Sequence, residues 1–179
     1  MRDISKPLDS RYSCSRLSTH LAWGNISPRQ VYLFVRYHPQ YHKQKKRDLS
    51  AFLTRLKWRS HFIQKLEDEV SYEDKCNNSG FEKLEWSDRG YLKEAWEKGE
   101  TGVPLVDACM RCLWHTGYIN FRMRAMLVSF FCHHLDQDWR RGTDHLAWLF
   151  LDYEPGIHFT QFQMQVVLQA LIQSGYTIL

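Results

Sequence analysis

Apolar residues recur every three or four positions along most of this chain, a spacing typical of helices that bury one face. The clearest case is 49–66, and the segments 104–117 and 121–134 repeat the pattern. A shorter helix is expected to begin at 142–144 and to end near residue 152. No alternation of apolar and polar residues, the mark of a strand, interrupts these segments. The pattern therefore predicts an all-α fold.

Residues that begin and end helices stand at the borders of these segments. Ser27 followed by Pro28 is typical of an N-cap and a first helical residue, so a helix is expected from there. Pro104 opens another helix, and Gly117 is placed to end it. The polar stretch 71–89 has weak periodicity and is expected to be a long connection.

The composition is that of an ordinary globular protein. The chain has 179 residues, 44% apolar and 25% charged, so one soluble domain is expected. No segment approaches the run of about 20 apolar residues that a membrane helix needs. The first residues lack the apolar stretch of a signal peptide, and the five cysteines show no paired framework. These features predict a cytoplasmic protein.

Cys109 and Cys112 form a CxxC pair inside a helical pattern. Zinc needs about four ligands, and neither a second pair nor suitably spaced histidines follow. Two cysteines in a helical core are therefore the preferred interpretation, and no metal is expected.

The formal charge of +4 is distributed unevenly. Basic residues cluster at 43–47, as Lys43, Lys45, Lys46 and Arg47, and again at 140–141. Such clusters can bind phosphates and give salt-sensitive binding of nucleic acids. The alternative for each is a solvated loop.

Five motifs follow one another along the chain. They are SRLSTHLAWGNISPRQVY at 15–32, LKWRSHF at 56–62, AWEKGETGVPLVDACMRCLWHTGYINFRMR at 95–124, DWRRG at 138–142 and LDYEPG at 151–156. In order and separation they resemble the motifs of the flavin-binding half of DNA photolyases and cryptochromes. Five matches over residues 14–165 are far more specific than any single one. The resemblance implies a helical FAD-binding domain of the photolyase/cryptochrome type, truncated at both ends.

The flavin-binding residues are assigned from this resemblance. Considered alone, the hydroxyls of Ser15 and Ser18 beside Arg16 can donate to a pyrophosphate, or they can cap a helix. The resemblance implies the phosphate role, and it implies an arginine–carboxylate ion pair beside the flavin ring. The full set is Ser15, Arg16, Leu17, Ser18, Arg59, Arg124, Asp152, Glu154 and His158. His158 takes the place of the asparagine that the family usually sets near flavin N5.

Aromatic residues at three positions bear on electron transfer. The resemblance places Trp86 and Trp139 at the outer two positions of the family's tryptophan relay. The inner position, nearest the flavin, holds Phe162. Relay through three tryptophans is therefore in doubt, unless Tyr118 or Tyr153 supplies the missing step.

The residues expected to face DNA are Arg55, Trp58, Phe121 and Arg122. Trp58 matches the tryptophan that stacks on a flipped pyrimidine dimer in the family. Arg55 stands where pyrimidine-dimer photolyases carry a glutamate that faces the lesion. The alternative for Trp58 is a core tryptophan on an amphipathic helix.

Both ends of the chain depart from the family's pattern. The α/β antenna domain with which family members begin is absent from this chain, so an antenna chromophore is not expected to bind. Residues 1–165 are assigned to the FAD-binding domain, and 166–179 to an atypical tail. Because the tail replaces a Gly/Thr-rich loop of the family, we hypothesise that it is translated out of frame.

The sequence predicts an FAD-binding protein that repairs pyrimidine dimers in DNA with light, as a carbon–carbon lyase, or descends from such an enzyme. DNA is the expected partner, with no membrane and no metal. One alternative is a blue-light photoreceptor of the cryptochrome kind, which Arg55, His158 and Phe162 favour. Another is a non-catalytic fragment of a split or decayed photolyase gene.

Overall fold

The computed structural model describes residues 6–39, 41, 46–77, 79–87 and 89–173. Within those ranges the chain is helical and contains no strand, so the predicted all-α class is confirmed. The helices are α1 Pro7–Ser13, α2 Ser18–Ala22, α3 Pro28–Tyr37, α4 Lys46–Asp68, α5 Gly90–Lys98, α6 Pro104–Thr116, α7 Phe121–Ser129, α8 Arg140–Leu149 and α9 Pro155–Gln173, with 3₁₀ turns η1 Val70–Glu73 and η2 Ser79–Lys83 and a π turn η3 Phe130–His134.

The predicted helix borders at Ser27 and Gly117 are confirmed. Ser27 and Gln30 form a capping box, in which the Gln30 amide donates to Ser27 Oγ at 3.1 Å and the Ser27 amide donates to Gln30 Oε1 at 2.8 Å. Gly117 ends α6 with a φ of +62°, a conformation that glycine adopts without a steric penalty.

Two expectations for the second half of the chain need correction. α8 begins at Arg140, earlier than the predicted 142–144, because Asp138 Oδ1 accepts a hydrogen bond from the Arg140 amide at 3.0 Å. It also ends at Leu149, before residue 152. The segment 121–134 is helical throughout, but its last turn is a π turn.

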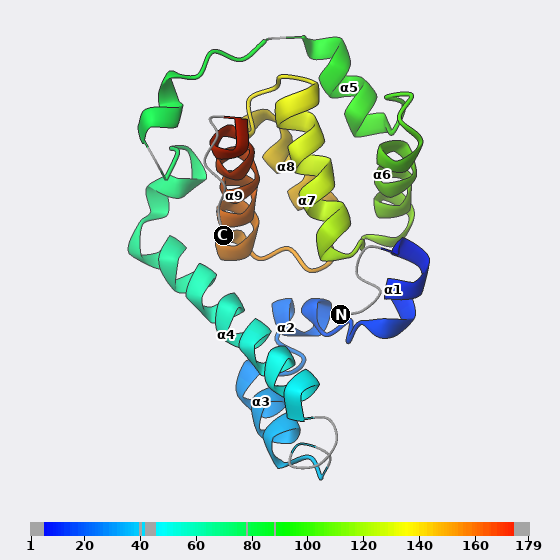
Figure 1. Cartoon of the computed structure of the whole chain (residues 1–179), viewed down its shortest axis with the longest axis vertical. Helices are drawn as coiled ribbons and strands as arrows, with labels where there is room; N and C mark the ends of the chain where they lie inside the picture. Colours follow the sequence, from blue (N-terminus) through cyan, green and yellow to red (C-terminus); the bar gives the residue numbers. More distant parts are fainter. Residues whose placement is uncertain (1–5, 40, 42–45, 78, 88, 174–179) are drawn as a thin grey trace.

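Helices α7 and α9 lie at the centre of the molecule, with α8 behind them (Figure 1). α4 runs along one side of this pair, while α5 and α6 pack together on the other side. α3 and the first part of α4 project from this body as an antiparallel pair. The largest fully buried side chains of the main core are Trp96, Trp139, Phe131, Met110, Leu113, Leu127 and Leu146.

α4 packs closely against the first turn of α9. A Cβ atom at Gly156 would lie 2.5 Å from the Cα of Ile63, which is a backbone atom that cannot swing aside. The absence of a side chain at Gly156 thus sets the distance between α4 and α9. The same contact places the α4 residues around Arg59 beside the start of α9.

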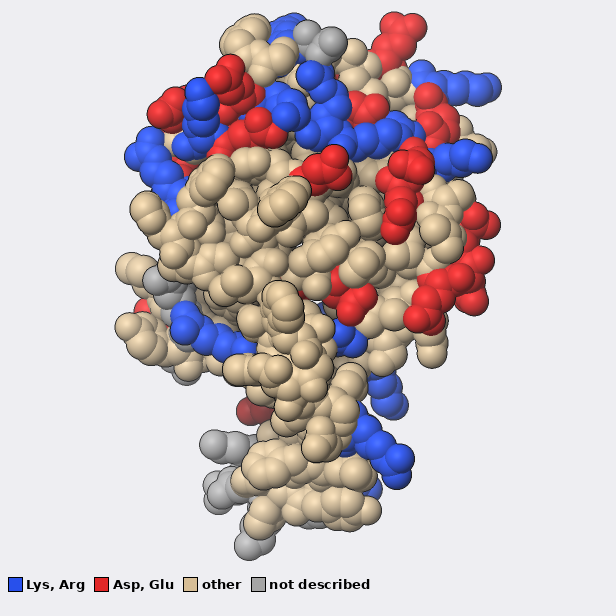
Figure 2. Space-filling model, turned by 180° about the vertical axis from the view of Figure 1, so that it is seen from behind, with Lys and Arg blue, Asp and Glu red and all other residues tan. Residues whose placement is uncertain are grey.

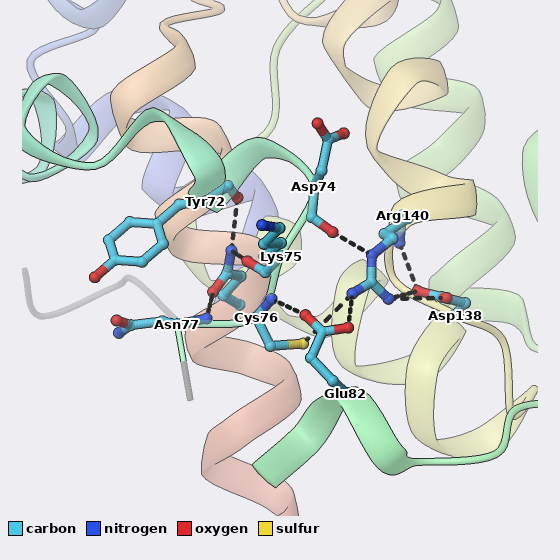
Figure 3. Close-up of polar contacts among 9 residues, drawn as sticks. Tyr72, Asp74, Lys75, Cys76, Asn77, Glu82, Asp138 and Arg140 are labelled. Carbon is cyan, nitrogen blue, oxygen red and sulfur yellow. Dashed lines mark hydrogen bonds and ion pairs between the residues drawn. The ribbon is translucent and has the colours of Figure 1, made fainter. Parts of the chain in front are cut away.

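The predicted connection 71–89 is held against the helices by two polar side chains. Gln163 of α9 donates to the carbonyls of Tyr72 and Lys75, and its Oε1 accepts from the Asn77 amide (Figure 3). Arg140 of α8 donates to Asp138, to Glu82 and to the carbonyl of Asp74. Hydrogen bonds thus order the connection, together with the packing of Cys76 and Trp86 against the main core.

These bonds also bear on the expected basic clusters. The guanidinium of Arg140 is engaged within the protein, and Arg141 donates to Gln137 Oε1 at 3.3 Å. The 140–141 cluster is thus part of the fold rather than a ready phosphate site. In the other cluster, Lys43 and Lys45 lie outside the described residues.

The predicted tail, 166–179, is only partly within the described range. α9 continues as a helix to Gln173, and residues 174–179 lie outside the part of the chain that the structure describes. The proposed change of reading frame stays a prediction. No helix among the described residues is long and apolar enough to cross a membrane.

Candidate functional site

A pocket lies where α7, α8 and α9 meet the segment that joins α8 to α9. It brings together three residues that the sequence assigned to flavin binding: Arg124, Asp152 and His158. The remaining lining residues are Ala125, Val128, Leu146, Phe150, Ile157, Gln161, Phe162 and Gln165.

Arg124 and Asp152 form a two-pronged ion pair at one wall of this pocket. Arg124 Nη2 donates to both carboxylate oxygens of Asp152, at 2.7 and 2.8 Å, and Nε donates to the Ile119 carbonyl at 3.1 Å. The guanidinium also lies over the Phe150 ring, 4.0 Å from its centroid. The Asp152 side chain is only 4% exposed, so its charge depends on this arginine.

A second ion pair lies two residues further along the chain. Arg59 Nη2 of α4 donates to Glu154 Oε2 at 3.0 Å, and the same nitrogen approaches the Leu21 carbonyl at 3.4 Å. Arg59 therefore ties the end of α2 and the start of α9 to one helix. The predicted Arg124–Asp152 pair and the Arg59–Glu154 pair, which the sequence did not predict, thus both hold the segment that leads into α9.

His158 is buried on the first turn of α9, with 8% of its surface exposed. Its Nε2 lies 2.9 Å from the Thr143 carbonyl. Because a carbonyl only accepts, Nε2 carries the hydrogen and Nδ1 keeps a lone pair. Burial lowers the pKa of this imidazole to about 4, so the ring is neutral at pH 7.

The segment 15–18 leads into α2, and the hydroxyls of Ser15 and Ser18 do not cap this helix. Leu17 is the N-cap of α2 and makes no side-chain capping bond, so the capping alternative for Ser15 and Ser18 is not what the structure shows. Arg16 has a φ of +53°, which is rare for a residue with a side chain. Its guanidinium lies 5.6 Å from the centroid of the Tyr118 ring.

Tyr118 connects that segment to the pocket. Arg124 lies on its ring as well, with 5.7 Å between guanidinium carbon and ring centroid, and the Tyr118 hydroxyl meets Cys14 Sγ at 3.4 Å. Burial raises the pKa of Tyr118 to about 12, so the phenol stays protonated. Tyr118 thus contacts both the arginine assigned to the phosphates of FAD and the arginine assigned to its ring.

The two predicted relay tryptophans occupy neighbouring segments. Trp139 is buried in the main core, and Trp86 packs against the same core. Ser87 donates from its amide and its hydroxyl to the Asp136 carbonyl, both at 3.0 Å. Gln137 Nε2 returns a bond of 2.9 Å to the Ser87 carbonyl. These bonds hold the Trp86 and Trp139 segments side by side.

Phe162, at the predicted inner relay position, is buried beside the pocket. Its ring centroid lies 4.9 Å from that of His158, and the Tyr153 ring lies 5.2 Å from His158 on another side. Tyr153 is therefore as near to the pocket histidine as Phe162 is, and it remains a candidate for the missing step.

The residues expected to face DNA lie on the surface of two helices. Arg55 and Trp58 belong to α4, and Phe121 and Arg122 open α7. All four are exposed, and Trp58 keeps 47% of its surface accessible although Phe62 and His61 flank its ring. Trp58 is therefore not the core tryptophan of the alternative interpretation.

On the rear face, the described Lys and Arg side chains near the upper edge are interleaved with Asp and Glu (Figure 2). Other Lys and Arg side chains are scattered over the lower half, and most of the middle of the face is uncharged. Sequence-independent binding of DNA needs a positive surface. This face is therefore a poor place for it.

Among the described residues, no three His, Cys, Asp or Glu side chains gather as a metal site. Cys109 is buried in α6, and burial raises the pKa of its thiol to about 11, which disfavours the thiolate that metals bind. Cys112 is half-buried, and its sulfur lies 3.9 Å from the Tyr118 carbonyl.

Two pocket residues, Gln161 and Gln165, had not been assigned from the sequence. They follow His158 on α9 at helical spacing, so the periodicity of that helix was the signal that could have found them. No assignment from the family's motifs points to them.

The pocket chemistry suits a flat, polar ring system such as flavin. Arg124 Nη1 and His158 Nδ1 have no hydrogen-bond partner among the described residues, so one donor and one acceptor remain for a ligand. The cavity between these side chains is small, about 40 Å³.

An all-helical fold with two partly buried arginine–carboxylate pairs beside such a pocket is the arrangement expected of a helical cofactor-binding domain. A family described as the FAD binding domain of DNA photolyase matches residues 52–176. The chain belongs to this family, within the photolyases and cryptochromes. FAD, the cofactor in that description, is the cofactor that the sequence predicted.

Similar proteins include both kinds of family member. A deoxyribodipyrimidine photo-lyase of Agrobacterium fabrum is 33% identical over 149 residues, 83% of this chain and 31% of the relative. A chloroplastic/mitochondrial cryptochrome DASH of Solanum lycopersicum is 33% identical over 83% of this chain and 25% of the relative. The crystal structure of a bacterial class III photolyase from Agrobacterium tumefaciens gives a TM-score of 0.81 at 32% identity, with 86% of this chain and 31% of that one covered. The chain thus spans about a third or less of the length of these proteins.

The buried His158 predicts a pH dependence of stability. Its pKa is lowered from about 6.5 to about 4 on folding, so the unfolded chain takes up a proton that the folded chain refuses. This contribution is fully present above pH 6.5 and is lost as the pH falls towards 4. From pH 7 to 5 we expect a loss of about 2 kcal/mol in the free energy of unfolding.

Urea denaturation of wild type and His158→Gln across this range measures the effect. The variant should lose less stability than wild type between pH 7 and 5, and the two curves should run parallel from pH 7.5 to 8.5. Equal slopes below pH 7 would contradict the assignment.

Proposed function

We propose that this chain binds FAD as part of a light-driven flavoprotein of the photolyase/cryptochrome family, with repair of pyrimidine dimers as its ancestral activity. The observation that carries the proposal is the meeting of Arg124, Asp152 and His158 in one pocket, with the Arg59–Glu154 pair beside it. Residues 15–18 are joined to this pocket through Tyr118.

Bound FAD would supply the photochemistry, and the protein would position it and set its electrostatic environment. Arg124 would offer the N–H groups that Asp152 and Ile119 do not take. His158 would offer its Nδ1 acceptor and stay neutral, so that it does not act as an acid at pH 7. Ser15, Arg16, Leu17 and Ser18 would bind the phosphates with hydroxyl, amide and guanidinium donors.

Two features favour a signalling role as the second candidate. Arg55 replaces a carboxylate at the lesion-facing position, and Phe162 replaces the inner tryptophan. The similarity to a cryptochrome DASH is as high as that to the photolyase. A protein without flavin would instead support the interpretation as a non-catalytic fragment. The cytoplasmic location and the boundary at residue 165 stay predictions.

The first test of the function is flavin binding. Purified protein should carry or take up FAD, seen as the visible absorption of oxidised flavin. Arg124→Ala leaves the Asp152 carboxylate buried without its cation, a loss worth about 3–5 kcal/mol at buried pairs, so retention should fall sharply. Arg124→Lys keeps the charge but loses the paired hydrogen bonds, so its flavin retention should lie between those of wild type and Arg124→Ala.

Arg122→Ala is the matched control, because Arg122 is exposed on the same helix and is not assigned to flavin. It should bind FAD as wild type does, with circular dichroism confirming that each variant is folded. If Arg124→Ala and Arg122→Ala retain flavin equally, the ring-side assignment is wrong.

The second test separates repair from signalling. Because Arg55 cannot accept the lesion's ring N–H, light-driven repair of dimer-containing DNA should be weak or absent. Arg55→Glu restores an acceptor and should raise repair. Arg55→Ala and Arg122→Ala should each reduce the slope of log K against log salt by about one, as expected for a lost phosphate contact. Efficient repair by the unmodified chain would falsify this expectation.

The third test concerns electron supply. Phenylalanine is much harder to oxidise than tryptophan, so Phe162→Trp should speed light-driven flavin reduction by an external reductant. The buried site makes overpacking worth about 1–3 kcal/mol, so flavin affinity and folding are measured in parallel. Trp139→Phe should slow the reduction. If only Tyr118→Phe or Tyr153→Phe slows the reduction, a tyrosine carries the electron-transfer step. If none of the four substitutions changes the rate, no aromatic relay is used.

A further inference from the structure

Trp23 makes a long-range hydrogen bond although most of its surface is exposed. The residue follows the last turn of α2 and is 72% accessible. Its indole Nε1 donates to the Leu151 carbonyl at 2.7 Å, across 128 positions of sequence. Leu151 directly precedes Asp152, the carboxylate of the pocket. Because most of the Trp23 ring is exposed to solvent, its contribution to core packing is small, and its main contact is this hydrogen bond.

Leu151 is held at both of its backbone groups. Its amide donates to the Gly117 carbonyl at 3.0 Å, while its carbonyl accepts from Trp23. Its side chain lies against Gly117 so closely that a Cβ there would come within 2.3 Å of Leu151 Cγ. With amide, carbonyl and side chain all fixed, the position of Asp152 follows from that of Leu151.

The other end of α2 carries the segment 15–18. α2 is one short helix from Ser18 to Ala22, and Arg59 Nη2 approaches the Leu21 carbonyl in its last turn at 3.4 Å. Trp23 therefore fixes one end of α2 to the Asp152 segment, while the opposite end presents Ser15 and Ser18. This bond therefore links the two halves of the candidate flavin site, residues 15–18 and Asp152, and contributes to the distance between them.

We propose that Trp23 is a positioning residue of the flavin site: its indole N–H, by holding the Leu151 carbonyl, sets the distance between the phosphate-side segment 15–18 and the ring-side pair Arg124–Asp152. The inference rests on the proposed function, because it assigns those two halves to the phosphates and to the ring of FAD.

The proposal predicts different effects on FAD and on the shorter flavin riboflavin. FAD reaches both halves of the site, so its affinity depends on their spacing. Riboflavin carries the same ring without phosphates and reaches only the ring-side half. Loosening the Trp23 bond should therefore weaken FAD and leave riboflavin unchanged, whereas a general loss of stability would weaken both.

The experiment compares Trp23→Phe with Trp114→Phe in the full chain. Both variants keep an aromatic ring and remove an indole N–H. Trp114 is the matched control, because it is 56% exposed and its Nε1 donates to the Glu97 carbonyl at 2.9 Å, on helices that carry no assigned flavin residue. Affinities for FAD and riboflavin are measured by flavin fluorescence, and amide hydrogen exchange at 151–152 is followed without flavin.

In Trp23→Phe we expect about a tenfold loss of FAD affinity, the effect of one net hydrogen bond, with unchanged riboflavin affinity and faster exchange at 151–152. Trp114→Phe should match wild type in all three. Equal FAD affinity in the two variants overturns the inference, and so does a proportional loss of FAD and riboflavin. A wild-type chain that binds neither flavin overturns the proposed function itself, which is a different outcome from either.

Discussion

Two arginine–carboxylate pairs hold the start of α9, and the arrangement of the central helices depends on them. Arg124 of α7 binds Asp152, and Arg59 of α4 binds Glu154. Two helices thus contact two carboxylates that are two residues apart in the sequence. Charges in such a place are tolerated only when each is paired, because burial removes the water that would otherwise stabilise them. Glu154 also precedes the first turn of α9, where a negative charge is favoured by the helix dipole. The entry of α9 into the core is therefore fixed by directional ionic contacts, while apolar packing fills the space around it.

Helix α4 has one surface that is open to solvent and another that contacts the start of α9. α4 carries Arg55 and Trp58 on its exposed side and Arg59 toward Glu154, within a little more than one helical turn. The absence of a side chain at Gly156 brings the backbones of α4 and α9 together at this level. Because consecutive residues of a helix lie about 100° apart, the exposed Trp58 and the Arg59–Glu154 ion pair occupy neighbouring faces of α4.

The sequence predicted what local chemistry decides. The helix starts at Ser27–Pro28 and Pro104 and the stop at Gly117 follow from side chains and φ preferences within a few residues. α8 begins before the predicted 142–144, because the Asp138 carboxylate accepts a hydrogen bond from the Arg140 amide, a contact that Gly142 does not indicate. Contacts between distant segments had no such signal. The Arg124–Asp152 pair was expected only because both residues lie in motifs of a recognisable family. Trp23 and Leu151 also lie in two of the motifs, but no role was assigned to either, and an exposed tryptophan at a helix end gives no hint of its partner.

The π turn at Phe130–His134 bears on how this part of the chain can change length. It holds one residue more than an α turn, as the bond from the Leu135 amide to the Phe130 carbonyl at 3.1 Å shows. Deleting one residue inside the turn would return it to α geometry and keep Leu127 and Trp139 facing the same core. A deletion elsewhere in α7 would rotate all later side chains by about 100° and turn buried residues outward. Single-residue deletions among descendants of this chain should therefore be tolerated best in these five residues, where the π turn holds one residue more than α geometry needs.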